Sequence, residues 1–357
     1  MTARRTSLIN KVEDSLLSLV PGGLDNSFVL MVSGGSDSVA LLLLLCELCT
    51  DARGSTDNLL VLHVNHQLRG ADALADEHFV RELCEELGIS CEVACADVAA
   101  FAKKTGVGVE QAGRTLRYEL AEQARVALSA EPGAHEPTGR TWHPEGYILT
   151  AHTAEDRAET LLQRIIVGGG SGSLASIPKR NGFVLRPLLE CSRQELQSWL
   201  TEKSMSVQGS LWREDATNLD TSYSRAFVRH ELLPLLAERN PRILESLNRT
   251  AEILTSESSW IDEQAALLLP LTGDSFNAPL PLLRRAVYLA CNEAIQELAP
   301  DARITFEQVE LISQKGGTPG FACQIPGGIE VRNKHGLLNF TKAKPPKHDP
   351  REIASKS

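Results

Sequence analysis

The sequence predicts an α/β protein whose first part is a doubly wound, mostly parallel sheet, followed by a smaller, mainly helical domain with a short strand-rich end. Three observations predict this class. Short apolar runs alternate with longer amphipathic runs in the first half, which is typical of strands joined by crossover helices. From Ser192 onward apolar residues recur at spacings of three and four. The segment Phe321 to Phe340 alternates around glycine-containing turns.

The first half contains an N-terminal surface helix and four strand–helix pairs. The helix is expected within Met1 to Val20, where charged and apolar residues mix in a way that a signal peptide would not. The expected strands are Phe28 to Val32, Leu59 to Asn65, Ser90 to Ala94 and Tyr147 to Ala151. The expected helices are Val39 to Cys49, Asp72 to Leu87, Glu110 to Leu128 and Ala154 to Val167.

The second half is predicted to be helical, with strands only near its end. The expected helices are Gln194 to Lys203, Ser224 to Ala237, Arg242 to Leu269 and Leu280 to Leu298. Pro241 is a natural helix start. The predicted organisation is an N-terminal helix (1–25), a nucleotide domain (26–223), a helical connection (224–240), a helical domain (241–342) and a disordered basic tail (343–357).

Composition limits the classes of function. The chain of 357 residues is 42% hydrophobic and 23% charged, as in ordinary globular proteins. Its net charge of −10 argues against a general nucleic-acid coat. Positive charge gathers late, with seven Lys or Arg against two acidic residues from Val331 onward. No apolar run approaches the length of about 20 residues that a membrane span needs, so we expect a cytoplasmic protein without a membrane partner.

The most informative stretch is the loop Ser33-Gly34-Gly35-Ser36-Asp37-Ser38, between the first expected strand and its helix. Backbone N–H groups and the positive helix end converge there, which favours an anion such as phosphate. The loop lacks the lysine of the Walker motif, and its adjacent glycines do not fit the dinucleotide fingerprint. The alternative is a plain tight turn with Asp37 as a helix cap.

Two further polar groups follow the strand ends or open a helix. His63 to Arg69 closes the second strand, so His63 and Asn65 are candidates for contacting a nucleotide, although strand-end histidines are often only structural. Arg114 and Arg117 share one helix face, where they could grip phosphate or carboxylate, or simply be solvated. Because the carboxyl ends of parallel strands share one edge, these groups should converge on one crevice.

The segment Thr150 to Thr160 carries a third group, His152, Asp156 and Glu159, on one face at a helix start. Such residues could hold a metal or grip an ammonium group. An attacking amine must be held and must lose a proton, and carboxylates or a histidine can do both.

Two other features of the sequence are interpreted as structural. The segment 129–146 is predicted to be a solvated insertion. Cys46 and Cys49 are interpreted as buried thiols, with sulfur transfer or an iron–sulfur cluster as the alternative.

Taken together, these motifs resemble a known family. SGGSDS after a strand is similar to the pyrophosphate-binding (PP) loop of the N-type ATP pyrophosphatases, which have an adenine nucleotide α hydrolase-like fold. The succession of SGGSDS, HVNHQLRG, EQAGRTLRY, LTAHTAEDRAETLLQRI, LRPLL and WREDATNLDTSYSRAFVRHELLPLL resembles the tRNA(Ile)-lysidine synthetases over roughly residues 26–250. Beyond Pro241 the resemblance is looser.

The resemblance implies an ATP-dependent ligase for tRNA modification. ATP would adenylate C2 of the wobble cytidine in a CAU-anticodon tRNA(Ile), releasing pyrophosphate. Free L-lysine would then displace AMP to form lysidine. The partners implied are this tRNA and lysine, and the cofactors are ATP and Mg²⁺. A homodimer is one possible oligomeric state.

The resemblance also implies roles for individual residues. Ser33, Gly34, Gly35, Ser36, Asp37 and Ser38 would bind ATP together with His63 and Asn65, and Asp37 would also face Mg²⁺. The catalytic set would be Asp37, Arg114, His152, Asp156 and Glu159. Contacts with tRNA would come from Arg117, Arg225, Arg229 and Arg239. Three alternatives stay open: a tRNA thiolase of the same superfamily, a non-catalytic nucleotide-binding module, and a small-molecule amidating enzyme.

Overall fold

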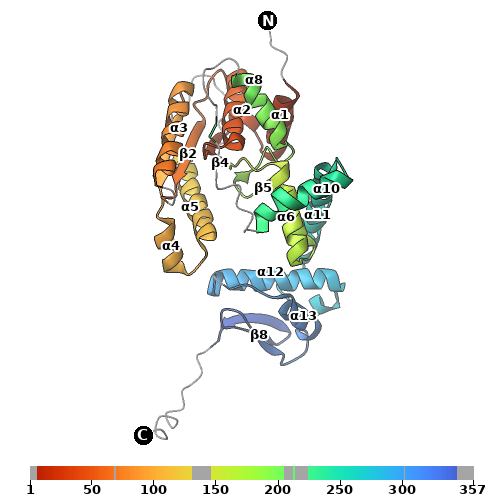
Figure 1. Ribbon diagram of the computed structural model, residues 1–357. Helices are drawn as coiled ribbons and strands as arrows, with labels where there is room; N and C mark the ends of the chain where they lie inside the picture. The colour runs from red at the N-terminus through yellow and green to blue at the C-terminus, as the bar shows by residue number, and fades with distance from the viewer. Residues whose placement is uncertain are drawn as a thin grey trace, which may run out of the picture. The chain divides into compact units, whose positions relative to one another are not determined.

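The computed structural model of the chain describes residues 6–67, 70–130, 146–204, 212–213, 224–300 and 302–343. The chain divides into two compact units, Met1–Thr255 and Ser256–Ser357 (Figure 1). Parts of four sequence predictions lie outside the described residues. They are Leu68 and Arg69, most of the 129–146 insertion, residues 214–223 of the longest motif, and the tail after 343.

The first unit is built on a six-stranded sheet in the order β3-β2-β1-β4-β6-β5. The strands are β1 (Ser27–Met31), β2 (Leu59–Asn65), β3 (Ser90–Cys95), β4 (Gly146–Leu149), β5 (Arg180–Asn181) and β6 (Val184–Leu185). All neighbours pair in parallel except β5 with β6. The predicted mostly parallel sheet is confirmed. The strands β5 and β6 were not expected, because two residues are too few for alternation to show in a sequence.

Helices connect several of these strands, and others precede β1 or follow β6. They are α1 (Ser7–Leu19), α2 (Ser36–Arg53), α3 (Ala71–Leu87), α4 (Val98–Thr105), α5 (Val109–Ala130), α6 (Ala154–Val167), α7 (Ser171–Leu174), α8 (Arg193–Ser204), α9 (Ser224–Phe227), α10 (Leu233–Arg239) and α11 (Ile243–Ala266). Helix α4 was not predicted, although the sequence carries its signals. Asp97 accepts a hydrogen bond from Ala100 at its start, and Gly106 ends it in the left-handed conformation.

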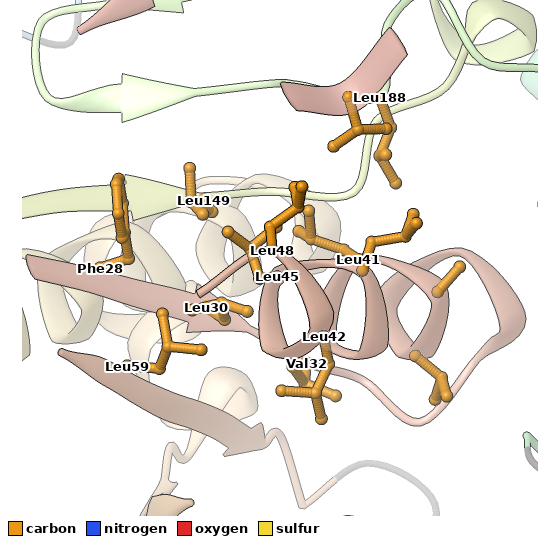
Figure 2. Packing of buried hydrophobic residues seen from close by; sticks show 14 of the residues in the cluster. Phe28, Leu30, Val32, Leu41, Leu42, Leu45, Leu48, Leu59, Leu149 and Leu188 are labelled. Carbon is orange, nitrogen blue, oxygen red and sulfur yellow. The ribbon is translucent and has the colours of Figure 1, made fainter. Parts of the chain in front are cut away.

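The sheet buries both faces, as its alternating side chains require. Phe28 and Leu30 of β1 belong to a large core with α1, α2 and α8, whereas Val29 between them belongs to the core under α5. Figure 2 shows Phe28 and Leu30 beside the leucines of α2. This packing explains why α2 is apolar nearly all round, with Leu41, Leu42, Leu44, Leu45 and Leu48 all 0% exposed.

The predicted helix Ser224 to Ala237 is interrupted by a π-helical turn at Val228–Leu232. The N–H of Leu233 donates to the carbonyl of Val228, one residue further back than in an α-helix. The next residue, Pro234, has no N–H to donate and its ring crowds the carbonyl four residues earlier. The proline therefore explains why the hydrogen-bond ladder shifts here, between Arg225 and Arg239.

The second unit has its own core of α12 (Leu280–Leu298), α13 (Phe306–Lys315) and an antiparallel sheet of β7 (Ala322–Ile325), β8 (Ile329–Lys334) and β9 (Leu337–Lys342). The sheet confirms the predicted strand-rich end. Helix α13 was not predicted. Its signal was a capping box, in which Thr305 and Gln308 exchange hydrogen bonds.

The order of strands locates the place where a ligand would bind. From β1 the chain continues to β2 on one side of the sheet, while β4 lies on the other side of β1 and leads to β6. In open parallel sheets, ligands bind beyond the carboxyl ends of the strands where the order reverses in this way. The carboxyl ends of β1 and β4 lead to Ser33–Ser38 and to His152. The sheet therefore brings two of the predicted groups to one edge.

Candidate active site

The loop Ser33–Ser38 turns sharply from β1 into α2. Gly34 has a φ of 94°, and Gly35 is the N-cap of α2. The Ser38 hydroxyl joins both sides of the turn by accepting from the N–H of Ser33 at 3.2 Å and donating to the carbonyl of Gly35 at 2.9 Å. Among the described residues, the N–H groups of Ser36 and Asp37 have no acceptor. The loop thus has the open donors that an anion requires.

The loop should be sensitive to a side chain at Gly34. A Gly34→Ala substitution forces a β-carbon into left-handed backbone; its Cβ would make only an ordinary van der Waals contact with Phe79 at 3.5 Å, so the strain comes from the backbone. We expect the free energy of unfolding to fall by about 1–2 kcal/mol. Urea denaturation measures this. The control is Ser36→Ala in the first turn of α2, which should change stability by less than about 0.5 kcal/mol; equal effects of both variants would contradict the strain argument.

Beside the loop, three carboxylates converge on one arginine. Arg193 Nε donates to Asp37 Oδ2 at 3.1 Å, Nη2 to Asp156 Oδ1 at 2.6 Å, and Nη1 to Glu159 Oε1 at 3.1 Å. Asp37 is in the first turn of α2, while Asp156 and Glu159 lie on one face of α6. The predicted convergence of Asp37 with the acidic helix face is therefore present, through a residue that was not predicted to belong to the site.

Arg193 is held by the start of α8. The Ser192 N–H donates to Glu195 Oε2 at 2.7 Å, and the Glu195 N–H donates to the Ser192 hydroxyl at 3.2 Å, which forms a capping box. The backbone N–H of Arg193 also bonds both carboxylate oxygens of Glu155. The pattern Ser192-x-x-Glu195 was visible in the sequence. It predicts the helix start but does not indicate that the enclosed arginine reaches across to α2.

Two further arginines complete this cluster. Arg225 Nε donates to Glu159 Oε2 at 3.0 Å and its Nη2 to Asp156 Oδ1 at 2.7 Å. Arg229 holds both oxygens of Glu159, at 2.7 and 3.0 Å. We call Asp37, Asp156, Glu159, Arg193, Arg225 and Arg229 the acidic–arginine cluster. The contacts of Arg225 and Arg229 with tRNA stay predictions, and here both guanidinium groups are bonded inside the protein.

The cluster shifts the pKa values of its carboxyl groups in opposite directions. Burial would raise the pKa of Asp156, but Arg193, Arg225 and the Thr153 N–H together lower it. Burial likewise opposes the lowering of the Glu159 pKa by Arg229 and Arg193. For Asp37, burial dominates and raises the pKa despite Arg193. Asp156 and Glu159 are therefore stabilised as anions, whereas the charge on Asp37 is disfavoured until a further cation is present.

His152 lies at the end of β4 and bonds Thr150 Oγ1 through Nδ1 at 2.9 Å. Burial lowers its pKa to about 4, and the positive charges of Arg186, Arg225 and Arg114 contribute. The imidazole is therefore neutral at pH 7. A neutral imidazole can accept a proton or a hydrogen bond, which a charged one cannot do.

The remaining predicted residues are arranged as follows. His63 Nδ1 is 2.9 Å from the carbonyl oxygen of Val32, and Asn65 donates to Glu77 at 3.1 Å, so both are bonded within the protein at the carboxyl end of β2. Arg117 on α5 is 3.3 Å from His66, and Arg239 is exposed at the end of α10. Their predicted contacts with nucleotide or tRNA stay predictions.

The cysteines do not have the properties that binding an iron–sulfur cluster or transferring sulfur would need. All eight are free thiols, and burial raises the pKa of Cys46 to about 12 and that of Cys49 to about 11. A protonated, buried thiol is a poor nucleophile and a poor metal ligand. Within the described ranges, no group of three or more His, Cys, Asp or Glu side chains could by itself enclose a metal ion.

Comparisons with known proteins agree with this geometry. A family model described as "PP-loop domain" matches residues 8–236. A curated tRNA(Ile)-lysidine synthase from Thermus thermophilus is 34% identical over 342 residues, or 93% of this chain and 59% of that protein. One from Clostridium perfringens is 30% identical, covering 92% of this chain and 68% of that protein. The chain belongs to the tRNA(Ile)-lysidine synthase family of PP-loop proteins.

The PP-loop fold is also seen among solved structures. A U34-tRNA thiolase, NcsA from Methanococcus maripaludis, is 17% identical with a TM-score of 0.50, over 70% of this chain and 78% of that one. At this identity the likeness concerns the fold alone. This chain spans 59% of the length of the Thermus thermophilus lysidine synthase. Among the described helices, none has the length and apolar character to cross a bilayer.

Proposed function

We propose that this chain ligates lysine to C2 of the wobble cytidine of a CAU-anticodon tRNA(Ile) at the expense of ATP, in the cytoplasm. One observation carries the proposal. The segments that align with relatives named tRNA(Ile)-lysidine synthase include the Ser33–Ser38 loop and the α6 face, which meet at the switch point of the sheet. An anion site beside an acidic cluster suits a reaction that joins a nucleotide and an amine.

ATP would bind with its β- and γ-phosphates on the Ser33–Ser38 loop. The N–H groups of Ser36 and Asp37 are free to donate, and the positive end of α2 favours the charge. Asp37 suits one Mg²⁺ oxygen ligand, because its carboxylate already faces a cation, Arg193, at 3.1 Å. When bound, Mg²⁺ would neutralise charge on the phosphates as pyrophosphate leaves.

Lysine would bind at the acidic–arginine cluster. Asp156 and Glu159 stay ionised because their pKa values are lowered, so they can attract an ammonium group. To reach them, lysine has to displace part of Arg193, Arg225 or Arg229. In the transfer step, the ε-nitrogen bonds to C2 and loses a proton, while the C2–O bond breaks and its electron pair leaves on AMP. His152, which is neutral at pH 7, would accept that proton.

A single assay tests the proposal. Purified protein is incubated with labelled lysine, ATP, Mg²⁺ and an unmodified CAU-anticodon tRNA. We expect pyrophosphate release and label in the tRNA, and no label when the wobble cytidine is replaced by uridine. Pyrophosphate release without lysine transfer, or transfer of sulfur instead, would overturn the proposal.

A further inference from the structure

A second charged group lies next to the acidic–arginine cluster, at the ends of β4 and β6. Arg186 is the first residue after β6, and His152 follows β4, the strand paired with β6. The Arg186 side chain is only 3% exposed. Arg114 and Tyr118 project from α5 toward the same place, and the Arg114 guanidinium is 5.2 Å from the centre of the Tyr118 ring.

Among the residues that the structure describes, Arg186 has no acidic partner. Its Nη1 donates to the carbonyl of Pro178 at 2.9 Å, but its buried Nε has no hydrogen-bond acceptor in the described part of the chain. Neither Arg186 nor Arg114 forms an ion pair with any described carboxylate. Burying a guanidinium without a counter-charge is unfavourable, so proteins normally pair such groups.

The neighbours of Arg186 do not supply the missing negative charge. His152 is neutral at pH 7 because burial and the nearby arginines lower its pKa to about 4. The Tyr118 side chain forms a hydrogen bond with Arg186 but is not a carboxylate. Asp156 and Glu159, the buried acids of the acidic–arginine cluster, are already held by Arg193, Arg225 and Arg229. The acidic–arginine cluster is thus balanced internally, and within the described part of the chain the positive charge of Arg186 is not matched by a carboxylate.

We propose that Arg186, assisted by Arg114, is the subsite for the α-phosphate of the nucleotide. The inference deepens the proposed function. The Ser33–Ser38 loop follows β1 and Arg186 follows β6, on opposite sides of β4, so the loop and Arg186 lie on the two sides of His152. Arg186 Nε completes its hydrogen bonding with a phosphate oxygen. The same contact stabilises AMP as it leaves in the second step.

The test compares binding of AMP and adenosine by calorimetry, without tRNA or lysine. The wild-type chain is expected to bind AMP more tightly than adenosine. Arg186→Gln should weaken AMP binding about tenfold or more and leave adenosine binding unchanged, because one charge-assisted hydrogen bond is lost. Arg186→Lys should restore part of the difference. The matched control is Arg125→Gln at the far end of α5, whose guanidinium pairs with Glu122 and which should behave as wild type.

Three outcomes would overturn the inference. They are an unchanged preference for AMP in folded Arg186→Gln, an equal loss of AMP and adenosine, or a loss confined to binding of an anticodon stem-loop RNA. If Arg186→Gln does not fold, Arg114→Gln replaces it, since Arg114 is exposed, and an unchanged AMP affinity then overturns the inference. Because these measurements need no lysine transfer, a failure of the proposed ligation would appear separately in the labelled-lysine assay.

Discussion

Asp37→Asn is expected to reduce pyrophosphate release by at least about 100-fold while leaving the protein as stable as the wild type, or slightly more stable. Under the proposed function, the loss in rate follows from removing the carboxylate that would face the phosphates and Mg²⁺. The stability follows from the raised pKa of Asp37, caused chiefly by burial. A carboxylate with a raised pKa disfavours the folded state at neutral pH, and this cost disappears as the pH falls through the folded pKa.

The measurement is pyrophosphate release at saturating ATP, together with chemical denaturation at pH 7. Asp57→Asn is the control, because Asp57 is a surface residue that pairs with Arg53 at 3.4 Å. It should keep near-normal rates. Near-normal turnover of Asp37→Asn would show that the Asp37 carboxylate is not needed at the phosphate site. A marked loss of stability would show that its contact with Arg193 outweighs the cost of burial.

Glu159→Gln is expected to lower the free energy of unfolding by about 2 kcal/mol at pH 7. Its side chain is 0% exposed and forms ion pairs with Arg193, Arg225 and Arg229. The substitution therefore removes one carboxylate from a site that keeps all three guanidinium groups. Removing one partner of a buried pair usually costs about 3–5 kcal/mol, and partial exposure of the arginines reduces that figure. Under the proposed function, the KM for lysine should also rise.

The dependence on pH separates this explanation from a simple packing defect. Although burial would raise the pKa of Glu159, Arg229 and Arg193 hold it below its ordinary value of 4.5. Its contribution to stability is therefore complete above that pH and disappears as the pH falls through the folded pKa. The difference in stability between wild type and Glu159→Gln should shrink from pH 7 toward pH 3. A constant difference would contradict the electrostatic explanation. Glu122→Gln, at an exposed pair with Arg125, should cost less than about 1 kcal/mol.

The same charges explain why the site could be predicted only in part. The Ser33–Ser38 loop and the spacing of His152, Asp156 and Glu159 are local features, visible in a few consecutive residues. Arg193 is 156 positions from Asp37 in the sequence, and no local pattern links them. Arg186 was visible only as part of a family motif, because the two-residue strand β6 that places it is too short for periodicity to show.

Local physical chemistry in the sequence determined the parallel sheet, most of its helices and the phosphate-binding loop. Alternating apolar runs must bury both faces of a sheet, and small residues after a strand leave backbone donors free. Only the tertiary structure decided how the charges are paired. It joined Asp37, Asp156 and Glu159 through Arg193, and it left Arg186 without an acidic partner among the described residues. Charge pairing depends on which strand ends and helix starts become neighbours, and that is fixed by contacts far apart along the chain.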